Sequence, residues 1–114
     1  MPNPFCHIEL STTDVPKAKA FYSKLFDWKL DDVMENYTLI NVGKGTGGGM
    51  MKNPGVPPFW LAYVEVDDID AATKKAASLG ATVVKDVTEV MGAGWLSILQ
   101  DPTGAALGLW KPGM

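Results

Sequence analysis

An internal repeat constrains the fold of this chain more than any other feature. Residues 7–14 (HIELSTTD) align with residues 61–68 (LAYVEVDD) at an offset of 54 residues, and both segments alternate like a strand before ending in aspartate. The same offset aligns the apolar positions of two helices: Ala18 with Ala72, Tyr22 with Ala76 and Leu25 with Leu79. We therefore expect two tandem copies of one strand–helix unit.

The first copy is predicted to be a strand, a helix and three more strands. Thr13 or Asp14 offers a side-chain oxygen to the first N–H groups of the helix, and Pro16 lies in the first turn, where proline is tolerated. Short apolar or alternating runs bounded by turn residues indicate strands at residues 5–11, 28–33, 37–42 and roughly 47–51.

The second copy follows a proline-rich segment, residues 52–58, which we interpret as a linker. Asp68 or Asp70 is expected to cap a helix that runs through Leu79 and ends at Gly80. A turn is predicted at residues 101–104 (DPTG), whereas the glycines at 92 and 94 leave residues 86–94 irregular. The expected strands are 59–66, 82–85, 95–100 and 105–110. The chain is thus one domain, 1–114, with module one at 1–51 and module two at 59–114.

Composition excludes several classes of partner. The 114 residues carry a net charge of −3, which does not favour nucleic acid or an anionic membrane. The longest apolar run, residues 59–64, is far shorter than the ~20 residues of a spanning helix. The first residues lack the pattern of a signal peptide, and the one cysteine, Cys6, suits a reducing compartment. We expect a cytoplasmic protein.

Three stretches, residues 7–28, 63–83 and 101–110, resemble the vicinal oxygen chelate superfamily, which includes glyoxalase I, bleomycin-resistance proteins and extradiol dioxygenases. The resemblance implies an α+β fold in which two tandem βαβββ modules form a curved, cup-shaped mixed sheet with helices outside. It also implies a homodimer, with the cup lying within one chain or between chains. Because one fold supports many chemistries, the resemblance predicts fold better than activity.

The metal ligands of the superfamily are mostly missing from this sequence. His7 occupies the first-strand ligand position of module one, but its counterpart in module two is Leu61. The terminal-strand glutamate is replaced by Gly108, and the remaining position falls in Gly47–Met51, which has no carboxylate or imidazole. Because a catalytic site needs about three protein ligands, we expect no cofactor. The alternative is a Zn, Ni or Mn ion held in part by His7.

Strand alternation predicts which side chains line the cup that the resemblance implies. His7 and Glu9 share a face of the first strand and could share a proton. Tyr37, Trp28 and Trp95 are expected mainly in the core. The predicted ligand-binding residues are Phe5, His7, Glu9, Met50, Phe59, Leu61, Tyr63 and Trp110.

The two polar candidates each have a structural alternative. His7 either contacts a ligand or is a hydrogen-bonded core or rim histidine. Glu9, an inward carboxylate, either pairs with His7 or a lysine, or is a general acid or base with a raised pKa. Met50 is either a pocket wall or a core side chain that fills a gap.

Two functions of different class follow from these residues. The first is a metal-independent protein that binds a small organic molecule in an aromatic cup, like the bleomycin-resistance branch. The second is a glyoxalase-related lyase or isomerase in which Glu9 is the catalytic base, with or without a divalent metal. A third interpretation, a structural subunit, predicts a cavity plugged by bulky side chains.

Overall fold

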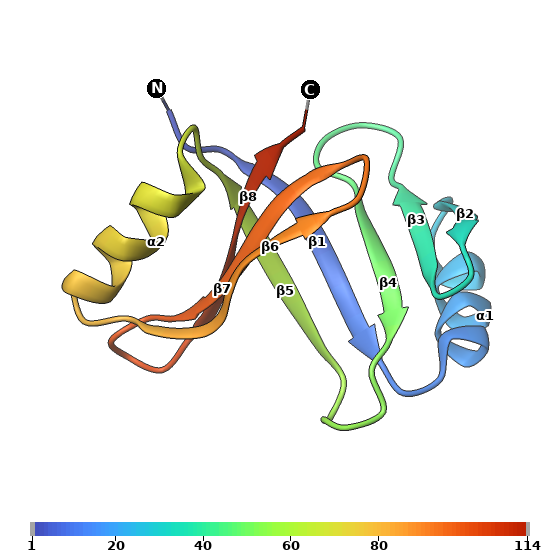
Figure 1. Ribbon diagram of the computed structural model, residues 1–114. Coiled ribbons are helices and arrows are strands. Elements are labelled where there is room, and N and C mark those ends of the chain that lie inside the picture. The colour runs from blue at the N-terminus through green and yellow to red at the C-terminus, as the bar shows by residue number, and fades with distance from the viewer. Residues whose placement is uncertain (1, 114) are drawn as a thin grey trace. The chain divides into compact units, whose positions relative to one another are not determined.

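The computed structural model describes residues 2–113, whose contacts form two compact units (Figure 1). Residues 7–61 make the first unit, and residues 62–113 together with residues 2–6 make the second unit. The fold class predicted from the sequence is confirmed: α+β, with two βαβββ-like modules, eight strands in mixed sheet and two helices. Within the described residues, neither helix is long and apolar enough to cross a bilayer.

The first unit carries one helix and its strands run in the order β2-β3-β4-β1. Strand β4 is parallel to β1, and β3 is antiparallel to both β2 and β4. The start of β5 also belongs to this unit, and the first two residues of β1 belong to the other. The elements are β1 (Phe5–Thr12), α1 (Val15–Leu25), β2 (Lys29–Met34), β3 (Tyr37–Asn41), β4 (Gly48–Lys52) and β5 (Phe59–Glu65).

The core of the first unit lies between α1 and one face of its strands. Leu10, Ile40 and Met50 are buried together, one from each of β1, β3 and β4. The α1 residues Ala18 and Tyr22 pack against them, as helical spacing predicted. Leu25, which was expected on the same apolar stripe, is 55% exposed. The opposite face of β1, β3 and β4 takes no part in this core and can carry functional side chains.

The second unit repeats this plan with the strand order β5-β8-β7-β6. Strand β8 is parallel to β5 and antiparallel to β7, which is antiparallel to β6. The elements are α2 (Ile69–Ser78), β6 (Thr82–Val90), β7 (Gly94–Gln100) and β8 (Ala106–Pro112), and the buried core is Val66, Ile69, Leu99 and Leu109.

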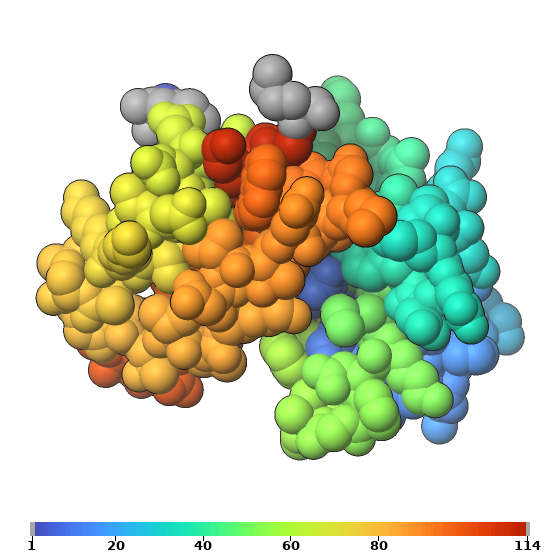
Figure 2. Space-filling view, in the orientation of Figure 1, coloured from blue at the N-terminus to red at the C-terminus, as the bar shows by residue number. Residues whose placement is uncertain are grey.

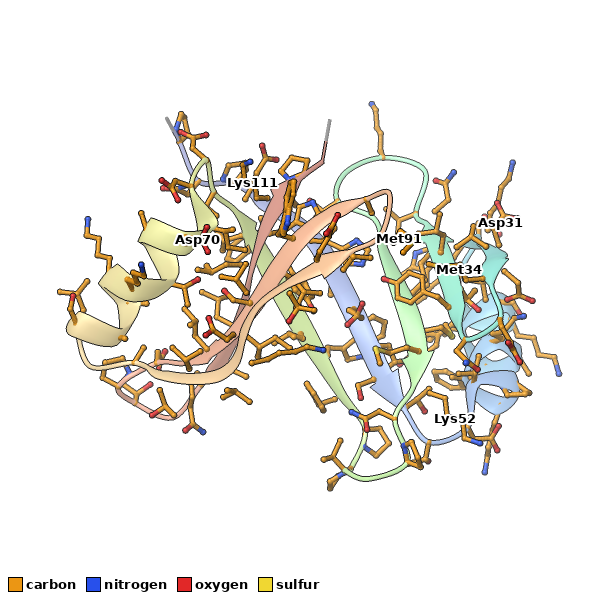
Figure 3. The ribbon with its side chains drawn as sticks, in the orientation of Figure 1. Asp31, Met34, Lys52, Asp70, Met91 and Lys111 are labelled. Atoms are coloured by element: carbon orange, nitrogen blue, oxygen red, sulfur yellow. The ribbon has the colours of Figure 1, made fainter. Side chains whose placement is uncertain are left out.

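Two hydroxyl groups are buried in the second unit and satisfy each other. Thr73 Oγ1 donates its one proton to the Ile69 carbonyl at 2.7 Å, so it accepts a hydrogen bond from Ser97 Oγ at 2.9 Å. On a different part of β7, the Lys111 ammonium lies 4.7 Å from the centroid of the Trp95 ring (Figure 3). Because Thr73 and Ser97 hydrogen-bond each other, their buried hydroxyl groups are compatible with a stable core.

The helix starts and one turn match the sequence expectations. Asp14 caps α1 by accepting a hydrogen bond from the Lys17 amide, and Asp68 caps α2 by accepting one from the Ala71 amide, both at 3.0 Å. Asp101 Oδ1 accepts hydrogen bonds from Thr103 and from the Ala105 amide, which lowers the pKa of its carboxyl. These bonds explain why DPTG makes a well-defined turn.

One strand is longer than predicted. Residues 86–90 were expected to be irregular but continue β6 to Val90, and the turn then contains Met91, which is almost fully exposed (Figure 3). The strand accommodates this length through register shifts between Val83 and Lys85 and between Lys85 and Thr88. Strand β6 ends the strand order of its unit and forms part of the surface seen in Figure 2.

Candidate functional site

The face of the first unit that is turned away from α1 carries the polar candidates. Because side chains alternate along a strand, His7, Glu9 and Ser11 lie on the face of β1 opposite Leu10. Strand register then defines two rows across this face. Glu9 pairs with Gly49, which pairs with Leu39, and Ser11 pairs with Met51, which pairs with Tyr37.

Three side chains on this face form a hydrogen-bonded chain, which we call the polar triad: His7, Tyr37 and Glu9. Tyr37 Oη donates to Glu9 Oε2 at 2.9 Å, and His7 Nε2 lies 2.7 Å from Tyr37 Oη. His7 Nε2 and Glu9 Oε2 are 4.0 Å apart, so the tyrosine oxygen bridges them. Because Tyr37 has one proton and donates it to Glu9, its oxygen accepts from His7, which fixes the proton of a neutral imidazole on Nε2.

Gly49 is the residue that makes room for this chain. A Cβ atom at position 49 would collide with the Tyr37 hydroxyl and with the adjacent ring carbons. The Tyr37 ring therefore lies across β4 above Gly49 and reaches Glu9 on the next strand. A glycine inside a strand often marks such a close approach, and this signal in residues 47–49 could have pointed to Tyr37, which the sequence places mainly in the core.

The electrostatics of the triad favour a neutral histidine. Burial lowers the pKa of His7 below 6.5, and the negative charge of Glu9 opposes that shift without cancelling it. The hydrogen-bond directions require a proton on Nε2, which the neutral imidazole can carry. Burial, followed by the charge of Glu65, raises the pKa of the nearby Cys6 thiol, so this cysteine is not an activated nucleophile.

The other predicted site residues of the first unit lie elsewhere. Met50 is fully buried beside Leu10 and Ile40 on the α1 side, so it does not share a face with the triad. Its neighbour Met51 does, and it is only half-buried. Leu61 is 4% exposed and Phe59 is 41% exposed. The structure thus brings together His7 and Glu9 from the predicted set and adds Tyr37.

The remaining candidates belong to the second unit, where Tyr63 and Trp110 share a face with Glu65, the register partner of Trp110. Tyr63 is 3% exposed, and its ring covers Gly108, its register partner on β8. Trp110 follows two residues later on the same face, paired with Leu96 of β7. Phe5 is 62% exposed. A side chain at position 108, where the family resemblance expects a metal-binding glutamate, would collide with the Tyr63 ring.

The donor set of the described residues does not fit a resident divalent ion. Residues 2–113 contain no group of three or more His, Cys, Asp or Glu side chains that could hold one. His7 and Glu9 supply two such side chains, and Tyr37 bridges them. Catalytic sites with an open coordination position use about three protein ligands.

The arrangement of two such modules defines a class of small α+β proteins, and residues 5–109 match the Glyoxalase/Bleomycin resistance protein/Dioxygenase superfamily. The chain belongs to this family, which confirms the resemblance predicted from the sequence.

Two curated relatives and one solved structure are similar to this chain. A Mycobacterium bovis protein named "Putative glyoxylase CFP32" is 35% identical over 91% of this chain and 44% of its own. The anthracycline biosynthesis protein DnrV of Streptomyces peucetius is 26% identical over 93% of this chain and 46% of its own. The chain therefore spans about half the length of these curated relatives. Methylmalonyl-CoA epimerase from Mycobacterium tuberculosis shares the fold, with a TM-score of 0.74, 17% identity and coverage of 96% of this chain and 88% of its own.

Proposed function

We propose that the chain binds a small organic molecule, without a metal ion, on the face of the first unit that carries the polar triad. The hydrogen-bonded chain of His7, Tyr37 and Glu9 is the observation that supports this proposal. The three side chains are only partly buried, so their polar groups lie at a surface that a ligand can reach. On this face the network offers oriented hydrogen-bonding groups beside an aromatic ring, which is the usual make-up of a small-molecule site.

A neutral or cationic aromatic molecule is the ligand class that fits these groups best. The chain has a net charge of −3, and Glu9 places a carboxylate on the binding face. An anionic ligand would be repelled by both. The half-buried Tyr37 ring, whose hydroxyl end lies over Gly49, provides an aromatic surface on which a second ring can stack.

The direct test measures binding of small aromatics by calorimetry and by ligand-observed NMR. We expect 4-methylphenol and benzylamine to bind more tightly than benzoate. Tyr37→Phe should weaken the binding of 4-methylphenol roughly tenfold, because the triad loses its bridging hydroxyl. Tyr22→Phe is the matched control: it removes the same atom on the α1 side of the strands and should leave binding unchanged. Tighter binding of benzoate, or no binding of any probe, would contradict the proposal.

A lyase that uses Glu9 as general base is the second candidate. The triad favours it in one respect, because the hydrogen bond from Tyr37 holds the Glu9 carboxylate in a fixed position, and a carboxylate can accept a proton from a carbon acid. The binding hypothesis is preferred because Tyr37 already donates a hydrogen bond to Glu9 Oε2. Turnover of the hemithioacetal of methylglyoxal and glutathione, with and without nickel or zinc, separates the two. Loss of such turnover in Glu9→Gln would assign the reaction to this residue.

We further propose that the protein is a cytoplasmic homodimer with no nucleic-acid or membrane partner. The homodimer is what the family resemblance leads us to expect. Around α1, exposed aromatic rings are in mutual contact and offer an apolar surface for a second copy: Phe21, Phe26 and Trp60 with Tyr22 and Trp28. Light scattering coupled to size exclusion would reveal a monomer if this is wrong.

A further inference from the structure

Ser11 has a buried hydroxyl whose hydrogen bonds are unmet. The residue is 5% exposed, and among the described residues its Oγ atom has no hydrogen-bond partner. Such a group is unfavourable in a folded protein, because it has lost its bonds to water and gained none in return. The contrast with Ser97 is direct, since that hydroxyl is also buried but is bonded to Thr73.

The orphan hydroxyl lies on the face of the polar triad. Ser11 follows Glu9 by two residues on β1, so both side chains point to the same side, about 7 Å apart along the strand. Met51 lies between Ser11 and Tyr37, because it is the register partner of both. A methionine side chain is unbranched and flexible, and this one is only half-buried. It can move aside for a ligand.

We infer that Ser11 is a specificity-determining residue that hydrogen-bonds a second polar group of the ligand, about 7 Å from the group held by the triad. This inference rests on the proposed binding function and narrows its ligand class. The preferred molecule is a flat aromatic ring with hydrogen-bonding groups at its two opposite ends. Ser11 has already lost its water in the folded protein, so a ligand hydroxyl that reaches it recovers a bond at little further desolvation of the protein.

The test compares two probes that differ in one hydroxyl, 4-hydroxybenzyl alcohol and 4-methylphenol. The wild-type protein should bind the alcohol about fivefold more tightly, and Ser11→Ala should reduce this preference to less than about twofold. Ser11→Cys, which keeps the side-chain shape but forms weak hydrogen bonds, should reduce it as well. The preference should be unchanged in Ser97→Ala. Affinities would be measured by ligand-observed NMR.

Thermal unfolding without any probe gives an independent readout. Ser11→Ala removes an unpaired hydroxyl, so its melting temperature should equal or exceed that of the wild type. Ser97→Ala breaks the bond to Thr73 and should lower the melting temperature. If Ser11→Ala were destabilised as much as Ser97→Ala, the hydroxyl would have a structural partner and the inference would be wrong.

The outcomes separate this inference from the proposed function. Equal binding of both probes by the wild type, weakened alike in Tyr37→Phe, would overturn the role of Ser11 while leaving binding at the triad intact. Failure of the wild type to bind either probe at millimolar concentration would overturn the proposed function, and the role of Ser11 with it.

Discussion

The two units use the same local device for different purposes. In each, a tyrosine ring lies over a strand glycine: Tyr37 over Gly49 in the first unit and Tyr63 over Gly108 in the second. Tyr37 is half-buried and its hydroxyl joins His7 to Glu9. Tyr63 is almost completely buried on a face that it shares with Trp110. The ring over glycine therefore belongs to a hydrogen-bonded chain in the first unit and is packed almost out of contact with solvent in the second.

The comparison teaches that the two copies of the repeat differ in where they carry polar side chains. The second unit keeps its polar pair, Thr73 and Ser97, buried inside the fold. The first unit also buries Thr38, which donates to Asp32 at 2.7 Å. It differs in carrying the polar triad and Ser11 on the face turned away from α1, and the Ser11 hydroxyl has no partner among the described residues. Unmet or partly exposed polar groups of this kind are found where a protein binds something.

The largest expected effect is a difference in stability between alanine substitutions at the two glycines, Gly108 and Gly49. Gly108→Ala should lower the free energy of unfolding by about 3 kcal/mol, because a new methyl group would collide with a Tyr63 ring that has no room to move. Chemical denaturation would measure it. Gly55→Ala is the control, since a Cβ there meets no atom within 4 Å. A loss below about 1 kcal/mol would mean that Tyr63 is loosely packed.

Gly49→Ala should act on the site more than on the fold. The half-buried Tyr37 ring can swing outward, so we expect a stability loss of only about 1 kcal/mol. Its hydroxyl would leave Glu9, however, and binding of 4-methylphenol should fall at least as far as in Tyr37→Phe. Calorimetric titration of both variants would check this. Wild-type affinity in Gly49→Ala would show that the position of Tyr37 is unimportant for binding.

The smallest effect concerns the charge of His7. We expect its pKa in the folded protein to lie below 6.5, because burial disfavours the charged ring, and Glu9→Gln should lower it further by removing the opposing negative charge. NMR titration is simple, since the chain has one histidine. A pKa above 6.5 would contradict the burial described for this ring.

The lowered pKa of His7 also makes the free energy of unfolding depend on pH. Below pH 6.5 the unfolded chain binds a proton on His7 more readily than the folded protein does, so the contribution of this residue is present above pH 6.5 and is lost as the pH falls. His7→Gln should not show this part of the acid-side loss. Denaturant unfolding at several pH values would measure the difference.

The elements of the fold were largely predictable because each has a local signal. Asp14 and Asp68 are side-chain caps followed by apolar residues at helical spacing, and both helices begin where predicted. Residues 86–90 were not predicted as part of a strand. They stay in β6 through register shifts in its pairing with β7, and this pairing cannot be read from the local sequence.

The candidate site was predictable only in part. Alternation along one strand places His7 and Glu9 together without knowledge of the partner strands. Tyr37 is far away in sequence, and its contact with them depends on the register of β3 and β4 and on the missing side chain of Gly49. Met50 and Met51 differ by one residue, and alternation assigns them to opposite faces only once the register of β4 is known.

The irregular β6 has a consequence for how this protein behaves at high concentration. A straight outer strand presents a continuous ladder of N–H and C=O groups on which a neighbouring molecule can extend a sheet. The two register shifts interrupt that ladder, and Lys85, Asp86 and Glu89 add charge along it. Stacking of one molecule on another through this edge, the first step toward fibrils, is thereby disfavoured.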